Sequence, residues 1–260
     1  MTPYQQWISF YTMVRKDVVR MFRIWVQTFL PSVITSTLYF AIFGTILGSR
    51  IGQMQGVDYM SFVVPGLVML AVVTTSYANT SFTFFSSKFF ARSIDEILVS
   101  PTPPWLLVAG FAAGGVVRGV LVGALVLLVS LFFTGLSLSV YSLLVILGFA
   151  ILTALGFSLA GLVNGIYAKT LDGINIVPTF VLTPLVYLGG IFYSVHVLPQ
   201  WWQNITFANP LFYLVNGFRY GFLGTADITL WLSTGVLLGL IALLIAINWY
   251  LLRTGLGLRQ

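Results

Sequence analysis

Cysteine is absent from this 260-residue sequence, which therefore has no disulfide, no thiol nucleophile and no thiolate metal site. Charged residues are also scarce and make up 7% of the chain, whereas ~25% is typical of a soluble domain. Hydrophobic residues account for 58%. This composition predicts an integral membrane protein, and the length fits one membrane domain without a sizeable soluble domain beside it.

Acidic residues and histidine are few, and none falls where ion-coupled transport would need it. Ion-coupled transporters commonly use carboxylates or histidines inside the membrane. The only histidine, His196, has no second metal ligand near it and is interpreted as a solvated loop residue. The acidic residues all lie outside the spans predicted below: Asp17, Asp58, Asp95, Glu96, Asp172 and Asp227. The sequence therefore indicates that the energy for any transport comes from elsewhere.

Catalytic motifs are missing as well. No serine lies in a GxSxG elbow, and no pair of carboxylates flanks a pocket, so an intramembrane enzyme is the weakest interpretation. The tripeptide 168–170, AKT, resembles the end of a phosphate-binding loop. However, Val163 and Ala168 stand where that loop needs glycine, and the tripeptide follows a membrane span instead of a strand. We therefore expect no ATP hydrolysis by that route and no metal site in this chain.

The apolar runs predict an all-α membrane protein with six transmembrane helices. Each run is near the ~20 residues needed to cross the bilayer core. The predicted spans are 27–49, 60–85, 106–133, 141–167, 174–194 and 229–252. They lie in a transmembrane domain of residues 27–253, which follows an N-terminal helix within 1–26 and precedes a tail of residues 254–260.

Residues 4–25 predict an amphipathic helix that lies in the headgroup region, because aromatics line one face and cations the other. The basic residues also predict the orientation, since cytoplasmic segments carry more of them. With both termini inside, the outer segments hold only Arg50 and Arg219. The inner segments hold Arg15, Lys16, Arg20, Arg23, Lys88, Arg92, Lys169, Arg253 and Arg259.

The longest polar interruption, residues 86–105, predicts a short cytoplasmic helix over 87–98. Phe90, Ile94, Ile97 and Leu98 fall on one helical face, and prolines from Pro101 onward end the helix. Such a helix could present its charges to a soluble partner, or it could be an ordinary solvated loop. The charges on its polar face are Lys88, Arg92, Asp95 and Glu96.

Two further features fall near or inside the membrane. The apolar stretch 210–224 is too short to span and is broken by Pro210 and several glycines, so residues after the fifth span are expected to form an outer re-entrant hairpin. Arg118 is the only clear charge inside a predicted span. It is a functional candidate on that ground, and equally a structural cation that reaches carbonyls or a polar side chain on a neighbouring helix.

Two stretches carry a family resemblance: ARSIDEILVSPTPPW (91–105) and PLVYLGGIFYSVHVLPQWWQNITFANPLFYLVNGFRYG (184–221). The second is similar to a C-terminal signature in which a glycine-rich helix precedes Asn209-Pro210 and Arg219-Tyr220. With the layout of helices described above, nearly the whole chain resembles the ABC-2 type permease family. These proteins are the membrane subunits of type V ABC transporters, and the chain looks like their compact bacterial form.

The resemblance implies a homodimer in the bacterial inner membrane, with two copies of a separate ABC ATPase bound beneath it. The 87–98 segment would be the coupling helix that contacts the ATPase through its charges, and the N-terminal helix would help to hold that subunit. ATP and Mg²⁺ would bind to the partner, so this chain would hold no cofactor and no nucleic acid. The exported cargo would be amphipathic: a lipid, a glycan or a drug-like molecule. The alternative is a channel or facilitator that needs no ATPase.

The predicted orientation can be tested directly, because single cysteines can be introduced into a chain that has none. Cysteines at Gln55 and Gln203 are expected to react with an impermeant maleimide in intact cells. Cysteines at Ser93 and Gln260 are expected to react only after permeabilisation. External labelling at position 93 would contradict both the orientation and the coupling role of the 87–98 segment.

Overall fold

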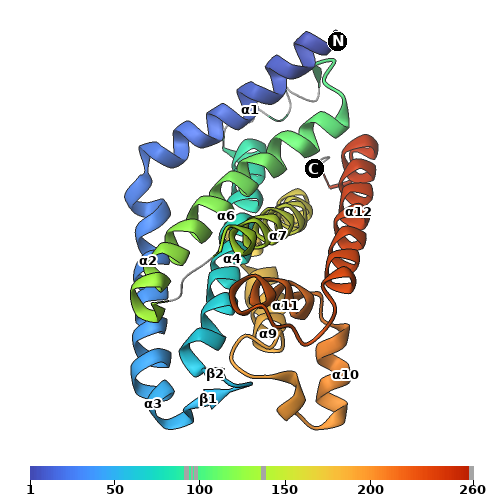
Figure 1. The fold of residues 1–260 in the computed structure, drawn as a ribbon. Coiled ribbons are helices and arrows are strands. Elements are labelled where there is room, and N and C mark those ends of the chain that lie inside the picture. Colours follow the sequence, from blue (N-terminus) through green and yellow to red (C-terminus); the bar gives the residue numbers. More distant parts are fainter. Residues whose placement is uncertain (91–93, 95, 97–98, 136–138, 258–260) are drawn as a thin grey trace.

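The computed structural model describes residues 1–90, 94, 96, 99–135 and 139–257, and the described chain is almost entirely helical (Figure 1). Two of the helical segments, η1 and η2, are π-helical, and η3 is a 3-10 turn. The elements in order are α1 (Pro3–Arg23), α2 (Trp25–Phe40), η1 (Ala41–Leu47), α3 (Gly48–Ile51), β1 (Gln53–Met54), β2 (Val57–Asp58), α4 (Tyr59–Phe89), α6 (Pro104–Thr134), α7 (Val140–Tyr167), α8 (Leu171–Val177), η2 (Pro178–Leu182), α9 (Thr183–Tyr187), η3 (Val195–Val197), α10 (Gln200–Ala208), α11 (Pro210–Leu223) and α12 (Leu230–Thr254).

The predicted all-α membrane fold is confirmed, apart from one small hairpin. Strands β1 and β2 pair antiparallel through a two-residue turn in which Gln55 and Gly56 both have positive φ. Turns of this kind match the twist of the strands that they join. In the described residues, five helices are long and apolar enough to cross a membrane: Trp25–Ile51, Tyr59–Phe89, Pro104–Thr134, Val140–Tyr167 and Leu230–Thr254.

The predicted span 174–194 corresponds to a shorter apolar helix, Leu171–Tyr187, which runs through α8, η2 and α9. The helix ends early because the chain turns at Gly190, whose φ is +73°. Ile191 then packs beside Gly66 of α4, where a Cβ on the glycine would lie 2.7 Å from the isoleucine Cγ2. Residues after 187 therefore belong to a packed loop, although their apolar character continues the helical run.

Helix α4 is the centre of the fold. Its most apolar window is 78% buried, against 12% for the first span and 17% for α12, and its main neighbours are α6 and α7. Figure 1 shows α1 crossing the end of the molecule that holds both termini, while the β-hairpin and α10 lie at the opposite end. We refer to these two ends as the terminal end and the hairpin end.

Glycines let α6 and α7 approach α4 at very short range. A Cβ on Gly161 of α7 would lie 2.4 Å from the carbonyl oxygen of Tyr77, and one on Gly165 would lie 2.8 Å from that of Ser81. On α6, a Cβ on Gly119 would lie 2.9 Å from the Cβ of Ser76. Small residues stabilise helix pairs in lipid because backbones can then make close contact. These glycines therefore serve packing within one chain.

Helices α10 and α11 form a helix-turn-helix at the hairpin end. Asn209 caps α11 by accepting from the Leu211 N–H, and its Nδ2 donates to the Leu185 carbonyl at 2.6 Å. Helix α11 has 14 residues and lies against α4, α7 and α12, with Leu214 and Phe218 fully covered. A buried helix of this length keeps its backbone groups paired while it is covered by protein.

The glycine contacts predict opposite outcomes for two substitutions on α7. Gly161→Ala places a methyl group against the fixed backbone of α4, and overpacking of this kind costs roughly 1–3 kcal/mol. Gly148→Ala meets nothing within 4 Å and should be neutral or slightly stabilising, since alanine is the better helix former. Thermal unfolding of the two purified variants measures the difference; an unchanged transition in Gly161→Ala would contradict the close approach.

Candidate functional site

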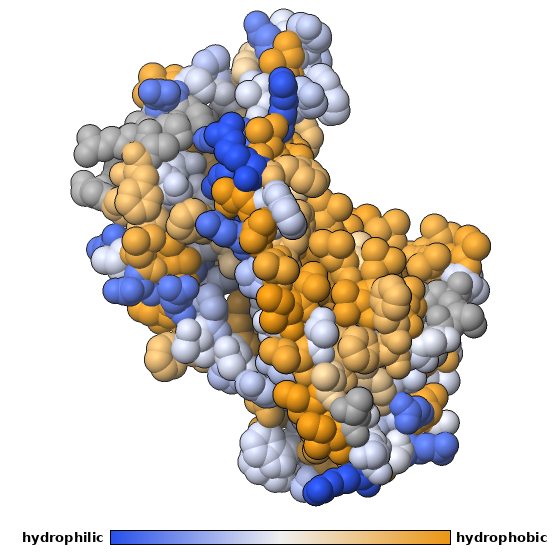
Figure 2. Space-filling model, turned by 90° about the vertical axis from the view of Figure 1, so that its left-hand side faces the viewer, coloured by the Kyte–Doolittle hydropathy of each residue, from blue (hydrophilic) through white to orange (hydrophobic). Residues whose placement is uncertain are grey.

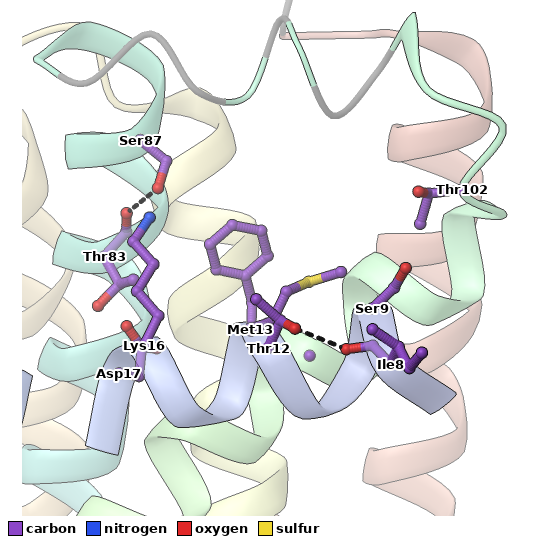
Figure 3. Close-up of a pocket in the computed structure, with 11 residues that line it drawn as sticks. Ile8, Ser9, Thr12, Met13, Lys16, Asp17, Thr83, Ser87 and Thr102 are labelled. Carbon is purple, nitrogen blue, oxygen red and sulfur yellow. Dashed lines mark hydrogen bonds between the residues drawn. The ribbon is translucent and has the colours of Figure 1, made fainter. Parts of the chain in front are cut away.

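A cavity of about 320 Å³ lies at the terminal end, between α1 and the adjoining ends of α4 and α6 (Figure 3). Its wall combines hydroxyl groups with one lysine, one aspartate and apolar side chains. The lining residues are Ile8, Ser9, Thr12, Met13, Lys16, Asp17, Thr83, Ser87, Thr102, Gly110 and Phe111.

Helix α1 can pack closely on α6 because α6 has glycines at the points of contact. A Cβ on Gly110 would lie 2.6 Å from Met13 Sδ, and a Cβ on Gly114 would lie 2.3 Å from Asp17 Oδ2. Asp17 is consequently 7% exposed. Burial raises the pKa of this carboxyl, and the positive charges of Arg20, Lys16 and Arg118 only partly offset that shift. The mainly basic helix α1 thus contains one buried acidic group.

Beside the cavity, two arginines share one amide oxygen. Asn79 Oδ1 of α4 accepts from Arg118 Nη1 of α6 at 3.0 Å and from Arg20 Nη2 of α1 at 3.4 Å. The same Arg20 nitrogen donates to Thr83 and lies 3.6 Å from Asp17. Arg118 Nε and Asn79 Nδ2 have no hydrogen-bond partner in the described part of the chain. A single asparagine therefore joins α1, α4 and α6 through charged donors.

The contact of Arg118 matches the structural alternative that the sequence left open, a cation that reaches a polar side chain on a neighbouring helix. The sequence did not identify Asn79 and Arg20 as its neighbours. A signal was available, since Asn79 and Thr83 lie one turn apart, and Asn79 is the only amide side chain in this predicted span. Polar residues one helical turn apart share a face, and that face is where both arginines arrive.

The four charges predicted for the coupling segment divide into two groups. Arg92 and Asp95 lie outside the described residues. Lys88 lies in the last turn of α4, and its Nζ donates to the carbonyl of Ile166 at 3.1 Å and to that of Gly257. Glu96 is exposed, whereas Ile94, two residues earlier, is 2% exposed and belongs to a core cluster with Phe84 and Leu107. Lys88 thus faces its own chain, and Glu96 faces outward.

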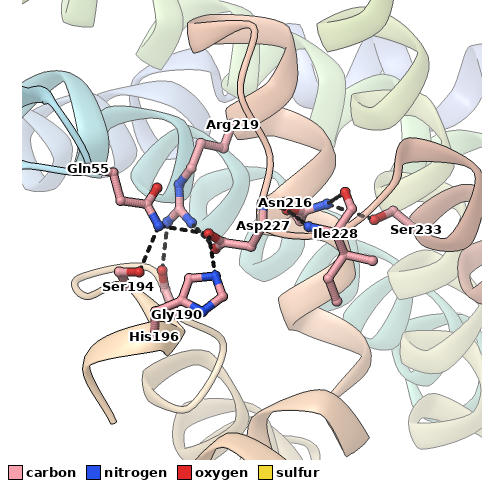
Figure 4. Close-up of polar contacts among 9 residues, drawn as sticks. All are labelled: Gln55, Gly190, Ser194, His196, Asn216, Arg219, Asp227, Ile228 and Ser233. Atoms are coloured by element: carbon pink, nitrogen blue, oxygen red, sulfur yellow. Dashed lines mark hydrogen bonds and ion pairs between the residues drawn. The ribbon is translucent and has the colours of Figure 1, made fainter.

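A second polar cluster lies at the hairpin end and is centred on Arg219 of α11 (Figure 4). This arginine is 1% exposed, donates to Asp227 Oδ2 at 3.1 Å and to the Gly190 carbonyl at 2.8 Å, and lies over the Phe62 ring at 3.9 Å. Two hydrogen bonds, one of them to a carboxylate, compensate the cost of burying its charge. The cluster therefore holds α11 against the loop at residue 190 and the start of α4.

Three more residues close the hairpin end. Gln55, from the β-turn, donates to Ser194 Oγ and to Asp227 Oδ1, both at 2.7 Å. His196 Nε2 lies 3.5 Å from the same carboxylate oxygen, and its side chain is 65% exposed. Asn216 accepts from the Asp227 N–H at 2.8 Å and donates to the Ile228 carbonyl at 2.8 Å. Within the described residues, no group of three or more histidines or carboxylates could hold a metal ion.

Comparisons with known proteins agree with this architecture. Residues 8–223 match the sequence profile of the ABC-2 type transporter family. The chain is 51% identical over 254 residues to "Inner membrane transport permease YadH" of Escherichia coli (strain K12), with 98% of each protein covered. It is 25% identical over 233 residues to "Nodulation protein J" of Rhizobium meliloti (strain 1021), covering 89% of this chain and 86% of that protein. The profile match extends from α1 into the last residue of α11.

Replacing the shared acceptor should weaken the contact between α1, α4 and α6. Asn79→Leu keeps a similar size but leaves both guanidinium groups without their amide oxygen, and a buried donor without a partner costs roughly 1–3 kcal/mol. Thr74→Val is the control on the same helix, because its hydroxyl donates only to carbonyls of its own helix. A clear fall in the unfolding temperature of Asn79→Leu alone is expected; equal temperatures for both variants would contradict a stabilising role for Asn79.

Proposed function

Because this chain belongs to the ABC-2 type transporter family, we propose that it is the permease subunit of an ATP-driven exporter whose ATP is hydrolysed by a separate ABC ATPase. The chain is a multi-pass protein of the inner membrane, with an inner membrane transport permease as a near-full-length relative. The proposed cargo is an amphipathic molecule: a lipid, a glycan or a drug-like compound. ATP and Mg²⁺ belong to the partner subunit in this proposal.

The observation that carries the proposal is the arrangement of the segment between α4 and α6. Ile94 is anchored in the core beside Phe84 and Leu107, while Glu96 remains exposed at the terminal end. A segment fixed by an apolar residue and presenting a charge can transmit a push from a soluble partner to α4 and α6, which it joins. Arg92 and Asp95 are proposed to act with Glu96 as coupling contacts, and Lys88 to hold the end of α4 in place.

Helix α1 is proposed to form the second part of the ATPase contact. It crosses the terminal end and carries Arg15, Lys16, Arg20 and Arg23. Its packing on the glycines of α6 and its link to Asn79 connect it to both of the helices that the coupling segment joins. A partner that grips α1 would therefore act on the same helices as one that presses on Glu96. Both termini lie at this end, which we propose is the cytoplasmic one.

A second copy of the chain completes the proposed permease. Only 12% of the most apolar window of the first span is buried, and Figure 2 shows a broad hydrophobic surface on the side of α1 and α2. On the short helix 171–187, Phe180 and Tyr187 are also well exposed. We propose that these two helices meet a second protomer and enclose the cargo pathway. The short helix, with the loop after it, then crosses the membrane as the fifth of six spans. Helices α10 and α11 form the outer re-entrant hairpin.

The coupling role predicts different defects for two neighbouring substitutions. Glu96→Lys reverses an exposed charge and should weaken binding of the ATPase without unfolding the permease; a mispaired charge at a contact costs up to several kcal/mol, and ~1.4 kcal/mol is already tenfold in affinity. Ile94→Asp places an unpaired charge in the core and should lower the yield of folded permease as well. Co-purification with the ATPase, its hydrolysis rate in lipid and the permease unfolding temperature separate the two effects.

Arg50→Glu is the matched control, since it reverses an exposed charge on α3 at the hairpin end. It should leave ATPase binding unchanged. Normal binding, hydrolysis and transport in Glu96→Lys, Arg92→Glu and Asp95→Lys would show that the segment is an ordinary loop without a coupling role. Cargo movement by the purified chain without any ATPase would instead establish the alternative function, a channel or facilitator.

A further inference from the structure

A narrow apolar groove of about 490 Å³ lies between α6 and α12, with α7 beneath it. Both outer helices pack on α7 and touch each other much less. In Figure 1 the first half of α6 and the last half of α12 lie at the terminal end. The groove is lined by Trp105, Val108, Ala109, Ala112, Ala113, Val116 and Val117 of α6, by Ile151, Leu155 and Leu159 of α7, and by Ile245 and Trp249 of α12.

Two features of the fold shape the groove: small residues on α6 make it deep, and a hydrogen bond between α12 and α7 holds its two sides apart. Three alanines, Ala109, Ala112 and Ala113, leave the surface of α6 low where larger side chains would fill the space. Asn248 of α12 is fully buried and donates to the Leu159 carbonyl at 3.0 Å. This bond fixes α12 on α7 at the bottom of the groove and thereby sets the distance between α12 and α6.

The length of the groove matches one leaflet of a membrane. From Trp105 to Val117 it follows α6 for ~18 Å, at ~1.5 Å per residue. The hydrocarbon core of a bilayer is ~30 Å thick, so one leaflet contributes ~15 Å. A single acyl chain has this length and an entirely apolar surface. The length and the apolar lining of the groove therefore suit one chain of a lipid.

Aromatic and basic groups mark the mouth of the groove at the terminal end. Trp105 and Trp249 are 50% and 40% exposed, and the Arg253 guanidinium lies 5.0 Å from the centre of the Trp249 ring. Tryptophan is enriched at the level of lipid headgroups, and a long basic side chain places its charge there. The mouth therefore offers indole rings to the glycerol region and a fixed cation to a phosphate.

We propose that this groove holds one acyl chain of a phospholipid from the leaflet at the terminal end, with the lipid phosphate beside Arg253. The occupant is a bound lipid and not the second protomer, which meets the face of α2 and of helix 171–187 proposed above. The choice of a lipid over a second protomer rests on the proposed function; the rest of the inference needs only that the chain is inserted in a membrane. It is independent of the ATPase and of the transported cargo.

Photo-crosslinking of a lipid tests the site on the full-length chain. The permease is reconstituted in nanodiscs of phosphatidylethanolamine and phosphatidylglycerol, with a trace of phosphatidylglycerol that carries a diazirine on its acyl chain. Crosslinks are expected to concentrate on peptides that contain residues 105–117 and 245–249. Arg253→Gln should lower occupancy of the site roughly fivefold, the factor that corresponds to the ~1 kcal/mol of one basic residue near a lipid surface.

Ala113→Phe fills the groove and should remove these crosslinks, with Ala109→Leu as a milder second variant. Ala246→Phe is the matched control, because Ala246 is exposed on α12 outside the groove and should leave the crosslinks unchanged. Size-exclusion profiles and unfolding temperatures verify that each variant is folded. Crosslinks spread evenly over the lipid-facing helices would overturn the proposal. Disulfide-linked dimers of Ala113→Cys would also overturn it, because a second copy would then occupy the groove.

Discussion

Helices inside a bilayer have no water to expel from between them, so their association depends on how closely their surfaces fit and on polar contacts between them. In this chain both conditions are met on α4. Gly161 and Gly165 bring α7 onto its carbonyl oxygens, and Gly119 brings α6 onto Ser76. The amphipathic α1 packs on a different face of α6 through Gly110 and Gly114. The position of α1, and of every charge that it carries, thus depends on the absence of side chains from one helix.

Two arginines, Arg219 fully buried and Arg118 partly buried, show how differently the two ends of the molecule are held. Arg219 has a carboxylate, a carbonyl and an aromatic ring around it, all from segments close to the hairpin end. Arg118 has one amide oxygen, which it shares with Arg20. Incomplete pairing of a buried charge is costly. Among the described residues neither arginine has a partner for its Nε, but the charge of Arg219 is paired with a carboxylate, whereas the amide contact of Arg118 is shared with Arg20 of α1.

The sequence predicted most of the helices, because hydropathy depends only on composition along the chain. It misplaced the end of the fifth apolar segment, where Gly190 turns the chain and Ile191 leaves the helical run to pack on Gly66. Hydropathy cannot predict a turn when the residues on both sides of it are apolar. The family and the contacts of the segment that contains Glu96 were expectations taken from the resemblance.

Contacts between residues far apart in the chain could not be predicted from the sequence, for a different reason. Arg118 and Asn79 are 39 positions apart, and Gln55 and Asp227 are 172 apart. Whether such residues meet depends on the rotation of each helix about its own axis. That rotation is set by packing and cannot be derived from the spacing of residues in one sequence.

The π-helical turns have a mechanical consequence. Segment η1 interrupts the first span at Ala41–Leu47, and η2 interrupts helix 171–187 at Pro178–Leu182, where Thr183 Oγ1 also donates to the Pro178 carbonyl. A π-turn holds one more residue than an α-turn, and such turns are rare and frequently lie at functional sites. When the extra residue passes to a neighbouring turn, the intervening piece of helix rotates by about 100° and advances by about 1.5 Å. Migration of the extra residue would therefore rotate part of either helix without moving its two ends.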